Sequence, residues 1–322
     1  MHITSVREPT VAAIGESELI RCIRQWLGPV APPSPAGMGD DCALLPASNV
    51  SQLITTDSLS YQVHFDDNVD AHQAGEKLIK RNLSDIAAMG GRPQHAVLAL
   101  LCGPNISITW LELFFRGIRS CCIQYDLQIV GGDISTLPPS QFSAVLTLFG
   151  STESVRLRNT AQAGDWIYVS GTLGGSIIHK HWSFTPRLQQ GSWLAARSEC
   201  SALMDLTDGL AKDLNALIPA QCQAKLDLSK IPISSDAITL ATQANRNPME
   251  LAFCDGEDYE LLFTVRSNQP IAFEHAWAQR FPQLQISRIG QLCVAGDGAR
   301  YVDSQTGESL AWTQGYEHLK QT

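Results

Sequence analysis

The chain has 322 residues and a formal charge of −9, because its 32 Asp and Glu residues outnumber its 23 Lys and Arg residues. The basic residues form no long run, so nucleic acid and anionic membrane are poor candidate partners. The length predicts two domains, and a hydrophobic content of 44% is sufficient for a globular core.

Features of the termini and the cysteines bear on location. Residues 1–10 lack the apolar core of a signal peptide, and the longest apolar run, residues 96–102, is too short to span a bilayer. Nine cysteines without C-x-x-C spacing favour reduced, mostly buried thiols over a disulfide framework or a zinc site. We therefore predict a cytoplasmic protein.

The first half alternates predicted strands and helices. Apolar residues recur at helical spacing over residues 18–27, and prolines then break the chain. Helices are predicted over residues 75–89 and 109–122. Strands are predicted over residues 53–56 (ending at Asp57), 94–102, 127–130 and 142–149. This alternation indicates an α/β or α+β domain over residues 1–150.

A polar stretch, residues 151–164, separates a predicted second domain over residues 151–322. A strand over residues 165–170 leads into the glycine-rich segment 171–176, which opens a predicted helix. A further helix is expected from Asp208 to Leu217, and a strand over residues 259–265.

Aspartates recur where these apolar segments end, at positions 40–41, 57, 85, 133, 205 and 208. One such residue is an ordinary turn or helix cap. Hard oxygen donors gathered from several strand ends are the ligands that Mg²⁺ requires when it also holds phosphate oxygens. Their recurrence predicts a metal site.

The predicted helix over residues 75–89 places Asp85 at the margin of its apolar face. On a helical wheel Leu78, Ile79, Leu83, Ile86 and Met89 share one arc, Asn82 lies within it, and Lys77, Lys80 and Arg81 fall outside. A carboxylate beside a buried stripe requires a cation or several donors. A capping or salt-bridged aspartate is the alternative interpretation.

The other acidic turns allow the same two interpretations. Adjacent Asp40 and Asp41 repel each other unless a cation shares them, and Thr55-Thr56-Asp57 offers several oxygens in succession; each could also be a plain turn or strand terminus. Gly131-Gly132-Asp133 lets the backbone approach a phosphate closely. Of the eight histidines, only His64, just past the Asp57 turn, is well placed for a site, and a surface or core role is equally consistent.

Familiar nucleotide and hydrolase motifs do not occur. Without G-x-x-x-x-G-K-[ST] a P-loop is excluded at the motif level, and the glycine-rich segment 171–176 lacks a lysine. Neither G-x-S-x-G nor H-E-x-x-H is present. If the protein uses ATP, metals must do the phosphate work that a P-loop lysine does elsewhere.

Read together, these segments resemble the thiamine-monophosphate kinase family, whose superfamily includes aminoimidazole ribonucleotide synthetase and selenophosphate synthetase. The resemblance covers nearly the whole chain. It runs through residues 15–16 (GE), 37–43 (GMGDDCA), 55–57 (TTD), 63–65 (VHF), 82–90 (NLSDIAAMG), 131–133 (GGD), 163–169 (AGDWIYV), 205–210 (DLTDGL), 256–263 (GEDYELLF) and 315–316 (GY).

The resemblance implies a two-domain aminoimidazole ribonucleotide synthetase-like fold: an α/β domain that binds metal and pairs in a homodimer, then an α+β domain that covers the nucleotide. It implies Mg²⁺ ligands at Asp41, Thr55, Thr56, Asp57, Asp85, Asp133, Asp205 and Asp208. It implies ATP contacts from Gly132, Arg158 and Thr207, and thiamine-phosphate contacts from His64, Glu257 and Tyr316.

Three departures from the family pattern lie in the second domain. The usual Gly-Asp-Ser is Gly174-Gly175-Ser176, a helical insert is shortened around residues 179–187, and the usual Gly-Gly-Glu-Asp is Asp255-Gly256-Glu257-Asp258. In addition, residues 159–161 (NTA) follow Arg158 where the family has Ser-Gly-Ala. These changes leave the metal residues intact and concern nucleotide packing and acceptor choice.

The implied activity is ATP-dependent phosphorylation of thiamine monophosphate to thiamine diphosphate. A phosphate monoester is already nucleophilic at neutral pH, so the transfer needs no general base but does need charge neutralisation and in-line placement, which Mg²⁺ held by the aspartates would supply. The alternatives are a related phosphotransferase with another acceptor and a catalytically silent member. Selenophosphate synthetase is disfavoured because no reactive-cysteine motif occurs near the N-terminus, and the retained aspartates argue against a silent protein.

Overall fold

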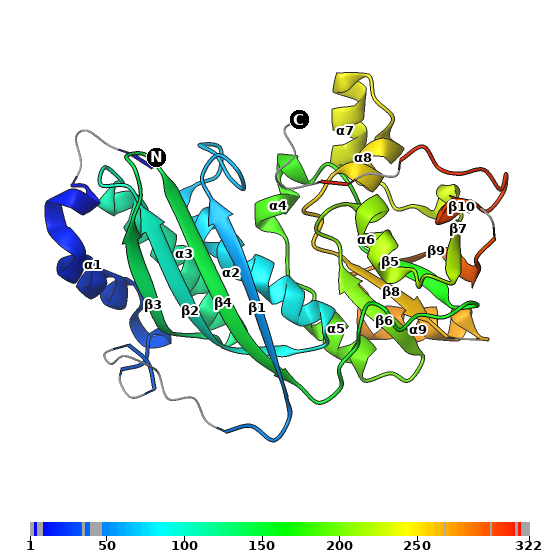
Figure 1. The fold of residues 1–322 in the computed structure, drawn as a ribbon, viewed down its shortest axis with the longest axis horizontal. Helices are drawn as coiled ribbons and strands as arrows, with labels where there is room; N and C mark the ends of the chain where they lie inside the picture. The colour runs from blue at the N-terminus through cyan, green and yellow to red at the C-terminus, as the bar shows by residue number, and fades with distance from the viewer. Residues whose placement is uncertain are drawn as a thin grey trace. The chain divides into compact units, whose positions relative to one another are not determined.

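The computed structural model describes residues 3–4, 9–33, 36–38, 47–266, 268–296, 298–312 and 315–316. The chain divides into two compact units, one of Met1–Ile86 with Arg92–Glu153 and the other of Ala87–Gly91 with Ser154–Thr322. Figure 1 shows the elements of both units. In the described part of the chain, no helix has the length and apolarity needed to cross a membrane.

The first unit is built on a four-stranded sheet in the order β1-β4-β2-β3. Only β2 and β3 are parallel, and the other neighbours are antiparallel. Its strands are β1 (Ser51–Ser60), β2 (Arg92–Cys102), β3 (Gln128–Thr136) and β4 (Phe142–Thr152). Its helices are α1 (Val11–Leu27), the 3₁₀ turn η1 (Gly28–Val30), α2 (Ala71–Ala88) and α3 (Ile108–Tyr125).

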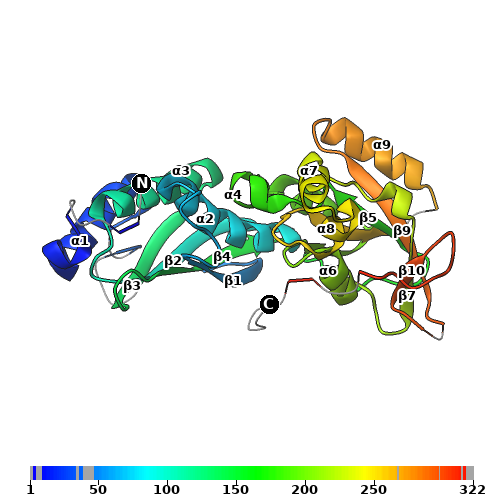
Figure 2. The same ribbon diagram turned by 90° about the horizontal axis from the view of Figure 1, so that it is seen from above.

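Helices α2 and α3 lie together on one face of this sheet (Figure 2). Alternate residues of β2 and β4 are buried, as expected when one face of a sheet is covered. The two helices approach each other at glycines: a Cβ on Gly75 would lie 2.0 Å from the Phe114 carbonyl oxygen, and one on Gly117 would lie 2.0 Å from the His72 carbonyl oxygen. Any larger residue would therefore force the helices apart.

The second unit contains a six-stranded sheet in the order β10-β7-β9-β5-β8-β6, antiparallel except for the β10/β7 pair. Its strands are β5 (Trp166–Ser170), β6 (Cys200–Asp205), β7 (Cys222–Leu226), β8 (Leu261–Val265), β9 (Ile286–Val294) and β10 (Tyr301–Asp303). Its helical elements are η2 (Ser176–Ile178), α4 (Lys180–Ser183), α5 (Leu188–Ala195), α6 (Leu210–Leu217), η3 (Leu228–Lys230), α7 (Ser235–Ala244), α8 (Pro248–Cys254) and α9 (Pro270–Arg280).

This second sheet has a hydrophobic core on each face. Successive residues of a strand point to opposite faces. Accordingly Tyr168 of β5 packs with Phe273 and Trp277 of α9, whereas its neighbour Ile167 belongs to the core that α6 and α8 complete. Figure 2 shows α9 and α6 on opposite sides of the sheet. Because both faces of the sheet are covered, every residue of β6 and β8 is buried, and burial does not alternate along either strand.

Two expectations about strand ends are wrong. Strand β1 continues through Asp57 to Ser60, and β3 continues through Asp133 to Thr136. The reason is pairing: each of the ten β1 residues has a partner in β4, including Asp57 opposite Leu146, and Asp133 pairs with Ala99 of β2. An aspartate weakens a strand locally, but pairing along its whole length overrides that preference.

The helical wheel also misplaced two lysines, Lys77 and Lys80, which are 0% and 8% exposed. The apolar arc of α2 is buried as expected, with Leu78, Ile79 and Leu83 all at 0% exposure, but Lys77 is also fully buried. Its long aliphatic stem packs inside while Nζ donates to the His64 carbonyl oxygen at 2.6 Å. His64 lies outside α2, so the helical periodicity of α2 cannot predict this hydrogen bond.

Candidate functional site

Strand β1 and helix α2 meet through two successive polar contacts. Thr55 Oγ1 donates to Asp85 Oδ2 at 2.5 Å, and Arg81 Nε lies 3.6 Å from Asp57 Oδ2. Thr55 and Asp57 are two residues apart on a strand, and Arg81 and Asp85 are four apart on a helix, so each pair shares a face. The structure therefore brings Thr55, Asp57 and Asp85 to one side of the first sheet, at the surface that faces α2.

Thr56 faces the other way. Its side chain lies on the opposite face of β1, where Thr56 Oγ1 donates to the Leu146 carbonyl oxygen and accepts from Thr147 Oγ1, each at 3.1 Å. Its predicted role as a metal ligand together with Thr55 and Asp57 stays a prediction.

Gly132 and Asp133 lie in β3, the edge strand that β4 and β2 separate from β1 in the same sheet. A Cβ on Gly132 would lie 1.9 Å from the Leu98 carbonyl oxygen, so only glycine allows this approach of β3 to β2. Asp133 is exposed, and its Oδ2 accepts a hydrogen bond from Ser135 Oγ at 2.9 Å. An exposed carboxylate next to a tightly packed glycine is available to a ligand.

His64 is held in one orientation and one tautomer. The Ser60 backbone N–H donates to His64 Nδ1 at 3.0 Å, and the buried Lys77 ammonium holds the His64 carbonyl oxygen. Because Nδ1 accepts, the neutral ring carries its proton on Nε2. The imidazole can therefore offer an Nε2–H donor.

In the second unit, Asp205 ends β6 and is buried to 8% exposure. The turn that follows is organised by Asp213 of α6, whose Oδ2 accepts from the Thr207 and Asp208 backbone N–H groups at 2.9 and 3.0 Å. Burial raises the pKa of Asp213 to about 7, although these hydrogen bonds oppose the rise. The Asp213 carboxyl thus fixes the backbone that carries two predicted site residues.

Asp208 and Tyr316 are joined through Lys212. Lys212 Nζ lies 2.6 Å from Asp208 Oδ2 and donates to the Tyr316 carbonyl oxygen at 2.9 Å, while the Tyr316 backbone N–H donates to the Asp208 carbonyl oxygen at 2.9 Å. The Tyr316 ring is 46% exposed. These contacts place the Tyr316 backbone against the Asp208 turn and leave its ring accessible.

The Glu257 backbone N–H donates to the Thr207 carbonyl oxygen at 2.7 Å, so Glu257 lies beside the same turn. Thr207, Asp208, Glu257 and Tyr316 are therefore brought together in the second unit. Arg158 is exposed in the segment between β4 and β5. Nearby Arg156 serves a structural purpose, since its Nη2 donates to the Arg197 carbonyl oxygen at 2.9 Å.

The predicted metal ligands are distributed over both units. Asp41 lies outside the described residues. Among the residues that the structure does describe, no group of three or more His, Cys, Asp or Glu side chains is placed to hold a metal ion. The donors that are present at the β1/α2 contact, two carboxylates and a hydroxyl, are hard oxygen ligands and fit Mg²⁺ chemically.

Sequence reasoning missed several residues that shape these sites. Lys212 follows Asp208 by four residues at the start of a helix, a spacing that predicts an ion pair and could have revealed it. Arg81 was seen only as lying outside the apolar arc of its helix. His181, which lies 3.4 Å from Glu257, gives no sequence signal because 76 positions of chain separate the two.

Residues 39–152 match the family model for AIR synthase related protein, N-terminal domain. This match defines the class of the first unit, an AIR synthase related N-terminal domain. A thiamine-monophosphate kinase of Escherichia coli (strain K12) is 33% identical, over 88% of this chain and 91% of that protein. One of Haemophilus influenzae is 30% identical, over 96% and 99%. The chain belongs to the thiamine-monophosphate kinase family and is a kinase.

Solved structures agree with this family assignment. AaThiL complexed with AMPPCP and TMP has a TM-score of 0.72 at 28% identity, covering 95% of this chain and 97% of that one. Thiamine-monophosphate kinase from Stenotrophomonas maltophilia K279a has a TM-score of 0.74 at 30% identity, with coverage of 92% and 98%. The expected two-domain aminoimidazole ribonucleotide synthetase-like fold is confirmed. Hydrogenase maturation protein HypE, at 17% identity and a TM-score of 0.74, shares that fold.

Proposed function

We propose that this protein transfers the γ-phosphoryl group of ATP to the phosphate of thiamine monophosphate and so forms thiamine diphosphate, with Mg²⁺ assisting an in-line transfer. The observation that carries the proposal is the β1/α2 contact, where Thr55, Asp57 and Asp85 share one surface. The relatives support it. The chain matches proteins named thiamine-monophosphate kinase over most of their length, and one solved relative is complexed with AMPPCP and TMP.

In the first unit, Thr55, Asp57 and Asp85 would hold Mg²⁺, and the resemblance also implies Asp41, Thr56 and Asp133 as ligands. In the second unit it implies Asp205 and Asp208. When bound, Mg²⁺ neutralises phosphate charge and stabilises the charge of the transition state. Four of these residues have partners in the chain that fit this role: the Thr55 hydroxyl donates to the Asp85 carboxylate and holds it in place, and Arg81 and Lys212 balance the charge of Asp57 and Asp208.

The acceptor side needs binding groups rather than a base. The thiamine phosphate is already an anion that can attack, so the chain must position it. His64 offers its Nε2–H, a donor suited to a phosphate oxygen, because Ser60 N–H occupies Nδ1. Glu257 and Tyr316 would bind the thiamine portion, Tyr316 through its exposed ring.

On the donor side, Gly132, Thr207 and Arg158 would contact ATP. Gly132 has no side chain to block a ligand and its backbone packs tightly against Leu98 of β2, and the fixed Thr207 backbone supplies a second rigid point. Arg158 is an exposed guanidinium of the kind that pairs with phosphate oxygens. Preorganised contacts of this kind favour the transition state because they require no rearrangement during transfer.

We further propose a homodimer in the cytoplasm. The face of the first sheet opposite α2 and α3 carries Ile54, which is 67% exposed, next to half-buried Phe149, its partner in β4. An apolar sheet face of this type suits pairing with a second copy. The described cysteines are free thiols, which fits a reducing compartment. Sedimentation analysis of wild type and Ile54→Glu tests the dimer; an unchanged dimer in Ile54→Glu contradicts this face.

One assay tests the reaction. Purified protein with ATP, Mg²⁺ and thiamine monophosphate should form thiamine diphosphate, detected by chromatography. Formation of product with another phosphorylated acceptor but not with thiamine monophosphate would support the alternative phosphotransferase. No transfer to any acceptor, in protein that still binds ATP, would support a catalytically silent member of the family.

A further inference from the structure

One short segment of the second unit contacts four consecutive residues around Glu257. The segment is residues 180–187, which contains α4, and the four residues are 257–260. His181 Nδ1 lies 3.4 Å from Glu257 Oε2, and the Phe184 ring stacks on Tyr259 with centroids 3.9 Å apart and planes 12° apart. The segment is the one in which the family's helical insert is shortened.

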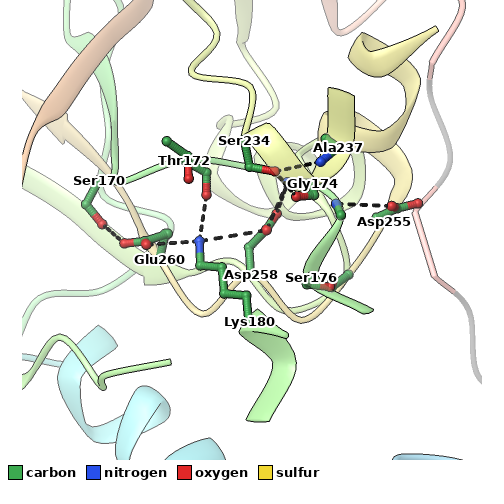
Figure 3. A network of polar contacts seen from close by, with 12 residues as sticks. Ser170, Thr172, Gly174, Ser176, Lys180, Ser234, Ala237, Asp255, Asp258 and Glu260 are labelled. Atoms are coloured by element: carbon green, nitrogen blue, oxygen red, sulfur yellow. Dashed lines mark hydrogen bonds and ion pairs between the residues drawn. The ribbon is translucent and has the colours of Figure 1, made fainter. Parts of the chain in front are cut away.

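Buried ion pairs make the other two contacts. Lys180 Nζ lies 3.0 Å from Glu260 Oε1 and 3.9 Å from Asp258 Oδ1, so one ammonium lies between two carboxylates (Figure 3). Arg187 binds Glu260 through both Nε and Nη2, at 2.8 and 2.7 Å. Asp258 and Glu260 are each 1% exposed. Pairs buried to this extent hold a fixed geometry, since breaking one leaves an uncompensated charge.

The backbone of 257–260 needs such support. Glu257 and Tyr259 both have left-handed backbone angles, with φ of 62° and 50°. Residues other than glycine rarely adopt left-handed backbone angles, and such angles persist only where surrounding contacts impose them. Between them, Asp258 accepts the Gly174 backbone N–H at 2.9 Å, which pins the middle of the segment.

The consequence is a fixed Glu257 carboxylate. Its Oε1 accepts from Tyr259 Oη at 3.1 Å and its Oε2 faces His181, which is 4% exposed. Stacking on Phe184 in turn fixes the Tyr259 ring. The Glu257 side chain remains 28% exposed, so it is anchored on both oxygens and still accessible from solvent.

We propose that His181 and Tyr259 are positioning residues that orient the Glu257 carboxylate toward the acceptor, and that segment 180–187 is thereby the acceptor-specificity element of this kinase. The inference rests on the proposed function, in which Glu257 binds the thiamine portion. Thiamine monophosphate carries a cationic thiazolium ring, and a carboxylate held in one orientation attracts a cation without paying for its own ordering.

The test uses full-length protein and substitutions that remove one contact each. Tyr259→Phe keeps the ring stack and removes the hydroxyl. His181→Leu removes the imidazole, and His181→Asn restores a donor near the position of Nδ1. His179→Leu is the matched control, because His179 is exposed and immediately precedes the segment. Steady-state KM for thiamine monophosphate, KM for ATP, kcat and melting temperature are measured for each.

We expect Tyr259→Phe and His181→Leu to raise KM for thiamine monophosphate roughly tenfold, the loss typical of one polar contact to a charged group, with KM for ATP unchanged. His181→Asn should recover most of the loss, and His179→Leu should match wild type. In a Glu257→Gln background the same substitutions should add little, because their effect passes through that carboxylate.

Three results overturn the inference, and they can be told apart. If wild type forms thiamine diphosphate but Tyr259→Phe and His181→Leu, both folded, keep a wild-type KM for thiamine monophosphate, these residues do not orient Glu257 and the proposed function stands. Should His181→Leu not fold, a wild-type KM in folded Tyr259→Phe leads to the same conclusion. If wild type forms no thiamine diphosphate, the proposed function falls and the inference falls with it. Equal effects in the wild-type and Glu257→Gln backgrounds also overturn the inference.

Discussion

Thr55 Oγ1 donates to Asp85 Oδ2 at 2.5 Å, so that a strand and a helix 30 positions apart present their oxygens at one surface. The hydroxyl stabilises one rotamer of the carboxylate without adding charge. A second contact joins the same strand and helix: the ion pair between Arg81 and Asp57, two residues later in β1 and four residues earlier in α2. Through these two contacts, β1 and α2 form one oxygen-rich surface in the first unit rather than separate acidic turns.

Loss of either carboxylate should abolish transfer without unfolding the protein. Asp57→Asn and Asp85→Asn each remove a charge that Mg²⁺ requires, and we expect kcat to fall by roughly 100-fold or more. The fold should persist, because asparagine still accepts from Thr55 or lies beside Arg81. Turnover and melting temperature are measured together. Asp126→Asn is the control, since Asp126 is an exposed αL helix cap where asparagine is comfortable; near-normal turnover in both site variants rules out these ligands.

The elements could be predicted from sequence where one periodicity dominated. The apolar stripe of α2 and the buried run of β2 identified those elements to within a few residues, since packing against a single face leaves a clear pattern. The extent of β1 and β3 could not be predicted: whether a strand stops at Asp57 or Asp133 depends on the partner strand, which local sequence does not contain.

The residues of the candidate site also differ in how far the sequence alone could indicate them. Asp205 and the Asp208 turn could be singled out from the sequence because acidic residues follow an apolar run there, and their role as metal ligands stays a prediction. The support of Glu257 by His181 and Tyr259 was not found, because it depends on tertiary contacts between segments whose individual sequences are unremarkable. Resemblance to a family supplied residue roles but gave no indication of the contacts that residues 180–187 make in this chain.

ATP binding should depend strongly on divalent cation. The site has acidic oxygens and no P-loop lysine, so without Mg²⁺ the ATP phosphates would meet carboxylates directly. We expect calorimetric titration with ATP to give an affinity at least about tenfold lower in excess chelator than in excess Mg²⁺. Equal affinities in the two conditions would exclude metal-assisted binding at these aspartates.

Asp213 should make the folded protein less stable as pH rises. Burial raises its pKa from 3.8 to about 7, so between these values the folded state holds a proton that the unfolded chain has released. The stability from this proton is present at low pH and is lost as pH rises toward 7. Asp213→Asn removes the loss, and its Oδ1 can still accept from Thr207 and Asp208.

The variant should therefore gain stability over wild type as pH rises from about 4 to about 7, by up to roughly 4 kcal/mol, and the difference should stay constant above pH 7. Denaturant unfolding of both proteins at several pH values measures it. A difference that is flat from pH 4 to 8, or that shrinks as pH rises, contradicts the assignment of the raised pKa to Asp213.

Tyr316 should act in acceptor binding through its ring alone. The Tyr316 backbone contacts Asp208 and Lys212, and these contacts survive truncation of the side chain. Tyr316→Ala should raise KM for thiamine monophosphate by a loss of roughly 1–3 kcal/mol of apolar contact and stacking, with little change in KM for ATP. Tyr316→Phe is the matched control, because it keeps the ring and removes only the hydroxyl. An unchanged KM for thiamine monophosphate in Tyr316→Ala would place the acceptor elsewhere, whereas equal losses in both variants would assign the contact to the hydroxyl.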